Sequence, residues 1–100
     1  MKGSRFDNIY VPIGALSSIS LEFILAVADK EYDKVQEIAN EILTGDFSIE
    51  KKELAILIYL QVLILKGHNE TARYLMKEFQ HSIKTDEVQS LCARTLACVN

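Results

Sequence analysis

The sequence predicts an all-α protein of stacked antiparallel helix hairpins, with about five helices. Glycine occurs four times and proline once, and apolar residues recur at spacings of three and four from Ala15 onward. With 49% hydrophobic and 25% charged residues, the chain can offset the entropy of folding. Its 100 residues suffice for one domain. We therefore expect a helical domain over residues 15–100, preceded by an extended arm over residues 1–14.

The first predicted hairpin joins helices over about residues 15–30 and 33–43, with a break near Glu31. The apolar stripe of its first helix comprises Leu16, Ile19, Phe23 and Val27. The inward residues of its second helix are Val35, Ile38, Ala39 and Ile42. Gly45 is placed where a left-handed residue would end that helix.

Three further helices follow. Ser48 is a good N-cap for the third, which continues through Lys66 until Gly67 stops it. Asn69 is expected to cap the fourth, which runs to about Ser82. Its inner stripe comprises Ala72, Leu75, Met76 and Phe79. The fifth opens at Thr85, ends near residue 97 and is amphipathic through Val88, Leu91, Cys92 and Thr95.

The arm over residues 1–14 differs from the rest, because Pro12 and Gly14 interrupt it while several apolar residues remain. Those apolar residues are Phe6, Ile9, Tyr10, Val11 and Ile13. Either the arm is a frayed terminus, or it packs on this chain's own hairpin or on a partner.

Charge and hydropathy exclude two classes of partner. Eleven basic and fourteen acidic residues give a net charge of −3, with no basic block for a phosphate backbone, so we expect no nucleic acid. The longest apolar run, residues 54–65, is interrupted by Gln61 and too short to cross a bilayer, so we expect no membrane insertion. Residues 1–7 lack the apolar core of a signal peptide, which makes the cytoplasm the expected location.

Enzymatic and metal chemistry are not expected either. The sequence contains no glycine-rich phosphate loop, no Gly-x-Ser-x-Gly and no His-Glu-x-x-His. Cys92 and Cys98 are six residues apart on one predicted helix, where they cannot form a disulfide with each other, and His68 and His81 are thirteen apart. We therefore predict a protein that is not an enzyme, with no cofactor or metal.

Two predicted turns can be superimposed with an offset of 37 residues. They are Lys30-Glu31-Tyr32-Asp33-Lys34-Val35 and Gly67-His68-Asn69-Glu70-Thr71-Ala72. This arrangement resembles the tetratricopeptide repeat, a helix hairpin with a period of about 34 residues. Tyr32, Gly67 and Ala72 fit that pattern. The sequence departs from it at Phe23, Val35, Ile42 and Leu60, where the family prefers smaller residues.

The third helix is apolar on every face, with Gln61 as its one strongly polar residue over three turns. A helix of this kind must be surrounded. Either the other helices and the arm cover it completely, or one stripe lines a groove for an apolar ligand helix. The resemblance places Ser20 and the following candidate partner-binding residues in that groove: Ile24, Val27, Leu54, Leu57, Gln61, Ile64, Val88, Leu91 and Thr95.

Residues 21–98 resemble the small tetratricopeptide-like chaperones of bacterial type III secretion needle subunits. The resemblance rests on the length of the chain, the Gly67 turn, the short hairpins and the apolar groove. That resemblance implies a chaperone that holds a polymerisation-prone small helical subunit, working with a second small helical protein as co-chaperone. Two other hypotheses remain open. One is an immunity protein that binds a basic toxin through the acidic first hairpin, and the other is an oligomeric helical-repeat scaffold.

Overall fold

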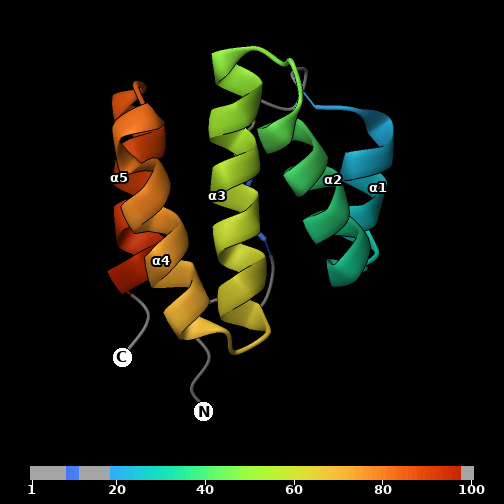
Figure 1. Ribbon diagram of the computed structural model, residues 1–100. Helices are drawn as coiled ribbons and strands as arrows, with labels where there is room; N and C mark the ends of the chain where they lie inside the picture. Colours follow the sequence, from blue (N-terminus) through green and yellow to red (C-terminus); the bar gives the residue numbers. More distant parts are fainter. Residues whose placement is uncertain (1–8, 12–18, 98–100) are drawn as a thin grey trace.

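A computed structural model describes residues 9–11 and 19–97 of the chain (Figure 1). Within these residues the protein is all-α, as the sequence predicts, and has five α-helices. Their bounds are α1 Leu21–Ala28, α2 Tyr32–Thr44, α3 Ile49–Leu65, α4 Asn69–Phe79 and α5 Asp86–Ala97. A short 3-10 helix, η2 (Gln80–Ser82), extends α4. Helices α1 and α2 form one antiparallel hairpin, α3 and α4 a second, and α5 follows as an unpaired helix.

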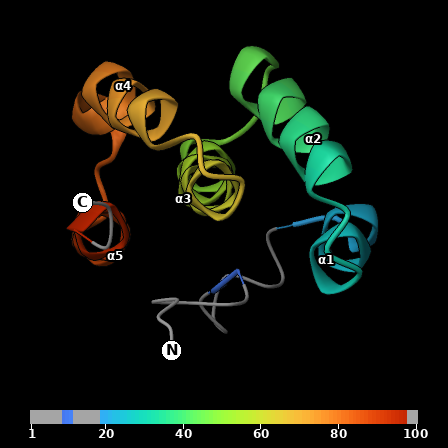
Figure 2. The same cartoon turned by 90° about the horizontal axis from the view of Figure 1, so that it is seen from below.

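Helix α3 is the central element, and it packs against α2, α4 and α5 (Figure 2). Two hydrophobic clusters lie along it. The first joins α1 and α2 to α3, and the second joins α4 and α5 to α3. Leu43 and Tyr59 contact both clusters and connect them into one core. Because α3 belongs to both clusters, burying it holds the two halves of the domain together.

The turns at the ends of α1 and α3 have the same construction. Lys30 and Gly67 both adopt positive φ angles, 58° and 81°. The amide of Glu31 donates to the carbonyl of Ala26 at 3.0 Å, and the amide of His68 donates to that of Leu63 at 2.8 Å. These bonds reach back over the same number of residues, as in a Schellman motif. The 37-residue offset predicted from the sequence therefore superimposes two equivalent helix ends.

Several predicted helix boundaries need correction. The Ser20 hydroxyl accepts a hydrogen bond from the amide of Phe23 at 3.2 Å, so Ser20 is the N-cap and α1 starts at Leu21. The predicted helix began at residue 15. Residues 19 and 20 lie outside the helix, and residues 15–18 lie outside the described residues. Asn69 is the first residue of α4 rather than its cap, because the Gly67 turn is tight enough that His68 already occupies the N-cap position. Ser48 caps α3 as predicted, accepting from the amide of Lys51 at 3.2 Å.

Gly45 ends α2, but the predicted left-handed conformation is wrong. Its backbone is extended, with φ −98° and ψ −175°. A Cβ atom at this position would lie 2.7 Å from the ring of Phe47 and 2.9 Å from the carbonyl oxygen of Glu41. Glycine is therefore needed here for space between α2 and the following loop, and the sequence pattern does not distinguish this need from a left-handed cap.

Glu53 is a buried carboxylate in the second turn of α3, with 2% of its surface exposed. Its Oε2 atom accepts hydrogen bonds from the backbone amides of Lys84 at 2.5 Å and Thr85 at 3.2 Å. These amides immediately precede α5, where the positive end of the helix dipole also favours a carboxylate. Glu53 thus fixes the start of α5 against α3.

Cys92 lies on α5, fully buried in the second cluster. Burial, and secondarily the negative charge of Glu53, raise the pKa of its thiol to about 12. The neutral thiol is inert as a nucleophile, because the thiolate is the reactive species. The structure therefore gives Cys92 a packing role.

Replacing Glu53 should destabilise the fold in a graded way. We expect Glu53→Ala to lower the free energy of unfolding by about 2–3 kcal/mol, since it leaves two amides without their charged acceptor. Glu53→Gln keeps an acceptor and should cost about 1 kcal/mol. Urea denaturation followed by circular dichroism measures both. Equal stability of Glu53→Ala and the wild type would contradict this role.

The Cys92 thiol should be unreactive in the folded protein. At pH 8 a pKa of about 12 leaves about one thiolate in ten thousand. A Cys98→Ser variant makes Cys92 the single thiol. We expect negligible labelling by Ellman's reagent until urea unfolds the chain, followed by stoichiometric labelling. Rapid labelling at pH 8 without denaturant would show that Cys92 is accessible.

Candidate functional site

The helices α1, α3 and α5 border one side of the domain, which we call the inner face. Residues 9–11 lie on this face, next to α3 and between α1 and α5 (Figure 2). Helices α2 and α4 lie on the other side. An extended segment from the start of the sequence therefore occupies the face on which the partner-binding residues were predicted.

Gln61 binds the backbone of this segment. Its Oε1 atom accepts from the amide of Tyr10 at 2.6 Å, and its Nε2 atom donates to the carbonyl of Tyr10 at 2.8 Å. The same Nε2 atom donates to the carbonyl of Leu57 at 3.3 Å, within α3. Gln61 is 3% exposed, and a buried amide needs such partners because an unpaired one would be costly. Gln61, the single polar residue within the apolar run 54–65, thus binds the backbone N–H and C=O of one residue.

The side chains of the segment alternate between core and solvent. Ile9 and Val11 are half-buried and pack against the first cluster. Tyr10, between them, is 55% exposed. This alternation is that of an extended chain. Of the two predicted alternatives for the arm, residues 9–11 pack on their own chain, and the rest of residues 1–14 lies outside the described residues.

The predicted partner-binding residues fall into two groups. Four are buried within the domain: Leu54, Leu57, Gln61 and Val88. Five are half-buried: Ile24, Val27, Ile64, Leu91 and Thr95. Ser20 is used as the α1 N-cap. The middle of α3 is therefore covered by this chain, whereas half-buried residues of α1, α3 and α5 remain at the edges.

Two kinds of feature were not predicted from the sequence. Gln61 was predicted to bind a partner protein, and its binding to the backbone of Tyr10 in the same chain was missed, although a single amide in an otherwise apolar run signalled the need for a polar partner. The large apolar side chains exposed elsewhere on the domain were not identified either: Leu21, Leu25, Phe47, Ile49 and Tyr74. Leu21 and Leu25 belong to α1, Tyr74 belongs to α4, Phe47 lies in the loop before α3, and Ile49 is the first residue of α3. None of them is a predicted site residue.

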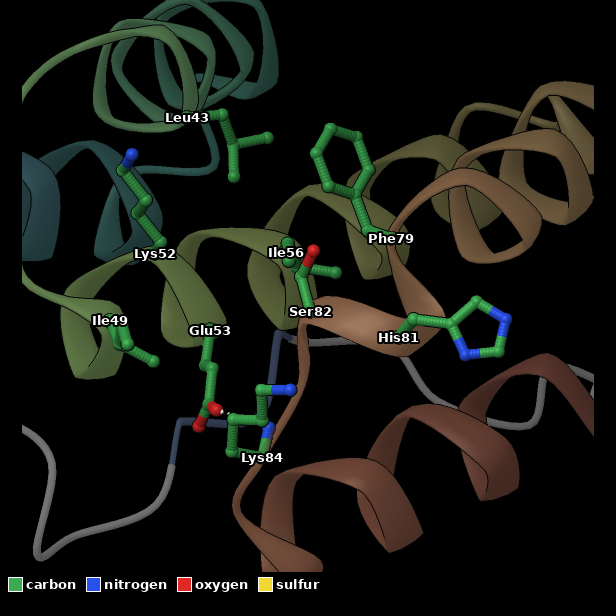
Figure 3. Close-up of a pocket in the computed structure, with 9 residues that line it drawn as sticks. All are labelled: Leu43, Ile49, Lys52, Glu53, Ile56, Phe79, His81, Ser82 and Lys84. Atoms are coloured by element: carbon green, nitrogen blue, oxygen red, sulfur yellow. Dashed lines mark hydrogen bonds between the residues drawn. The ribbon is translucent and has the colours of Figure 1, made fainter.

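A hollow of about 370 Å³ lies away from the inner face, where the ends of α2 and α4 approach the first half of α3 (Figure 3). Leu43, Ile56 and Phe79 provide apolar walls, and Lys52 and Lys84 contribute cations. The Glu53 carboxylate also borders it but is hydrogen-bonded to the amides before α5. His81 and Ser82 point apart, so they do not form a nucleophile–base pair (Figure 3).

Metal-binding clusters and membrane-spanning helices are both missing from the residues that the structure describes. Among these residues, no group of three or more His, Cys, Asp or Glu side chains is arranged to hold a metal ion. None of the described helices combines the length and apolar character needed to span a membrane. The backbone of Tyr10, bound by Gln61 on the inner face, is therefore the most specific feature on which to base a function.

Leu57 provides a test of how far α3 is covered. Its side chain is 1% exposed, so Leu57→Glu would bury an unpaired charge. We expect this variant to lose its helical circular dichroism and its cooperative unfolding. Tyr74→Glu, at a residue that is 64% exposed, is the matched control and should fold normally. A folded Leu57→Glu variant would instead place Leu57 on an open groove.

The chain was compared with protein-family descriptions, with curated proteins and with solved structures. None of these comparisons gave a match. No relative therefore supplies a function, which has to be inferred from the geometry of the inner face.

Proposed function

We propose that this protein binds a segment of another protein on its inner face and catalyses no reaction. The observation that carries the proposal is the pair of hydrogen bonds between the Gln61 amide and the backbone of Tyr10. A surface that holds one extended segment through its backbone has the chemistry to hold another, because peptide groups are common to all proteins. The half-buried apolar residues that the sequence analysis placed in the same groove, Ile24, Val27, Ile64 and Leu91, would add apolar contact.

Within this class we favour a chaperone for a polymerisation-prone subunit, the form to which the sequence resemblance points. Such a subunit would be kept from polymerising while a segment of it lies on the inner face. The apolar character of Ile24, Val27, Ile64 and Leu91 is consistent with this use. Binding of this type depends on apolar burial and should tolerate salt.

An immunity protein acting through the first hairpin has weaker support. The exposed acidic residues there are interspersed with lysines. Lys34 pairs with Glu22 at 3.6 Å, and Lys66 pairs with Asp33 at 2.6 Å. The Lys66 side chain, through its hydrogen bond and charge, lowers the pKa of Asp33. These two ion pairs involve Glu22 and Asp33, and they reduce the negative charge that a strongly basic partner would meet on the hairpin.

The proposal is tested with Ile64→Glu, which places a charge at a half-buried position of α3. Tagged wild-type protein, Ile64→Glu and the control Tyr74→Glu are used to capture partners from extracts of the source cell, at low and at high salt, with mass spectrometry of the bound proteins. We expect a small protein that wild type and Tyr74→Glu retain at high salt. Its affinity for Ile64→Glu should fall about tenfold or more.

The folded state of each variant is checked first by circular dichroism. Capture of a nuclease-like protein that is lost at high salt would contradict the inner-face proposal and support the acidic hairpin. Retention of the same partner by a folded Ile64→Glu variant would contradict it as well.

A further inference from the structure

We infer that residues 9–11 are a built-in occupant of the inner face, which a partner displaces by presenting an extended segment with apolar side chains two residues apart. This inference rests on the proposed function and specifies its ligand. It assigns the Gln61 amide as the group that selects an extended backbone. The observations behind it are the geometry of the Tyr10 hydrogen bonds, the alternation of Ile9, Tyr10 and Val11, and the limited burial of this segment.

The hydrogen bonds of Gln61 require an extended ligand. Its amide accepts from the N–H and donates to the C=O of the same residue, Tyr10. In a strand these two groups of one residue point to the same side, as in a β-ladder. In an α-helix they point in opposite directions along the axis and bond within the helix. An amphipathic helix therefore cannot reproduce this pair of bonds with groups from its interior turns.

The side-chain contacts define the rest of the ligand. Ile9 and Val11 pack against the first cluster, whereas the Tyr10 side chain is exposed. A ligand in the same position needs apolar residues at its first and third positions and tolerates most residues at the second. Backbone hydrogen bonds would supply affinity, and the two apolar contacts would supply specificity, as when a peptide pairs with a sheet edge.

The occupant is held loosely enough to be exchanged. Ile9 and Val11 are half-buried, and Tyr10 keeps 55% of its surface exposed. By contrast, Phe23, Val35 and the middle of α3 are fully buried among the helices. When the segment leaves, the Nε2 atom of Gln61 keeps its bond to the Leu57 carbonyl. Its Oε1 atom and second N–H are then available for the backbone N–H and C=O of one residue of a partner.

The inference is tested with a fluorescein-labelled peptide that has the sequence of residues 6–14, measured by fluorescence anisotropy. In wild type the internal segment competes with this peptide. Tyr10→Pro removes the amide that donates to Gln61, and the proline ring would clash with Oε1, 2.6 Å from the nitrogen. We expect this variant to remain helical and to bind the peptide at least about tenfold more tightly than wild type.

Two controls isolate the role of the amide. Gln61→Leu in the Tyr10→Pro background keeps an apolar side chain of similar size, and peptide affinity should fall at least about tenfold. A peptide that is N-methylated at the tyrosine should lose a similar factor, because it lacks the same donor. NMR of ¹⁵N-labelled wild type reports release of the segment without a substitution in it. Excess peptide should move the amide resonance of Tyr10 to the position that it has in the Gln61→Leu variant.

Several results would overturn the inference. One is that wild type and Tyr10→Pro bind the peptide equally tightly, and another is that Tyr10→Pro binds the methylated and unmethylated peptides equally tightly. A third is a Tyr10 resonance that excess peptide leaves unchanged. A fourth is loss of helical structure in Tyr10→Pro, which would make the segment part of the fold itself. These measurements need no cellular partner. If the peptide measurements contradict this inference, the Ile64→Glu experiment still tests the proposed function. If no cellular partner is found, the peptide measurements still test this inference.

Discussion

Helix α3 imposes the main constraint on this protein, because a helix that is apolar on all sides has to be enclosed. In a chain of 100 residues few elements are available for this task. Helices α2, α4 and α5 pack around α3, and residues 9–11 lie on the side that they leave. The two polar residues buried in α3 lie where non-helical backbone packs against that helix. Glu53 binds the backbone before α5, and Gln61 binds the backbone at Tyr10.

Much of the fold could be predicted from the sequence because its signals are local. The spacing of Val35, Ala39 and Ile42 identified the buried side of α2, and all three are buried. The two turns could be superimposed from their residues alone, because the residues that end one helix and start the next are close together in the sequence. Gly45 could not be interpreted correctly, since its need for glycine arises from the ring of Phe47, whose position depends on the folded loop.

The inner face was less predictable. The resemblance to the tetratricopeptide repeat placed Leu57 and Gln61 in one groove, but the apolar third helix fitted both a fully covered helix and one that lines a groove. The choice depends on which element covers it, and the covering residue Tyr10 is 51 positions away from Gln61. No local pattern encodes a contact over that separation. The amide of Gln61 indicated that a polar partner was needed, but not that the backbone of Tyr10 would provide it.

The same separation of 51 residues affects how the protein is synthesised. Residues 9–11 are synthesised before Gln61 is added to the chain. Helix pairing needs shorter loops, and the entropy of loop closure rises with length, so the hairpins can form before this contact does. On a nascent chain, Ile9 and Val11 therefore remain uncovered until α3 has emerged. During that interval other proteins can contact these two side chains, which the finished fold covers in part.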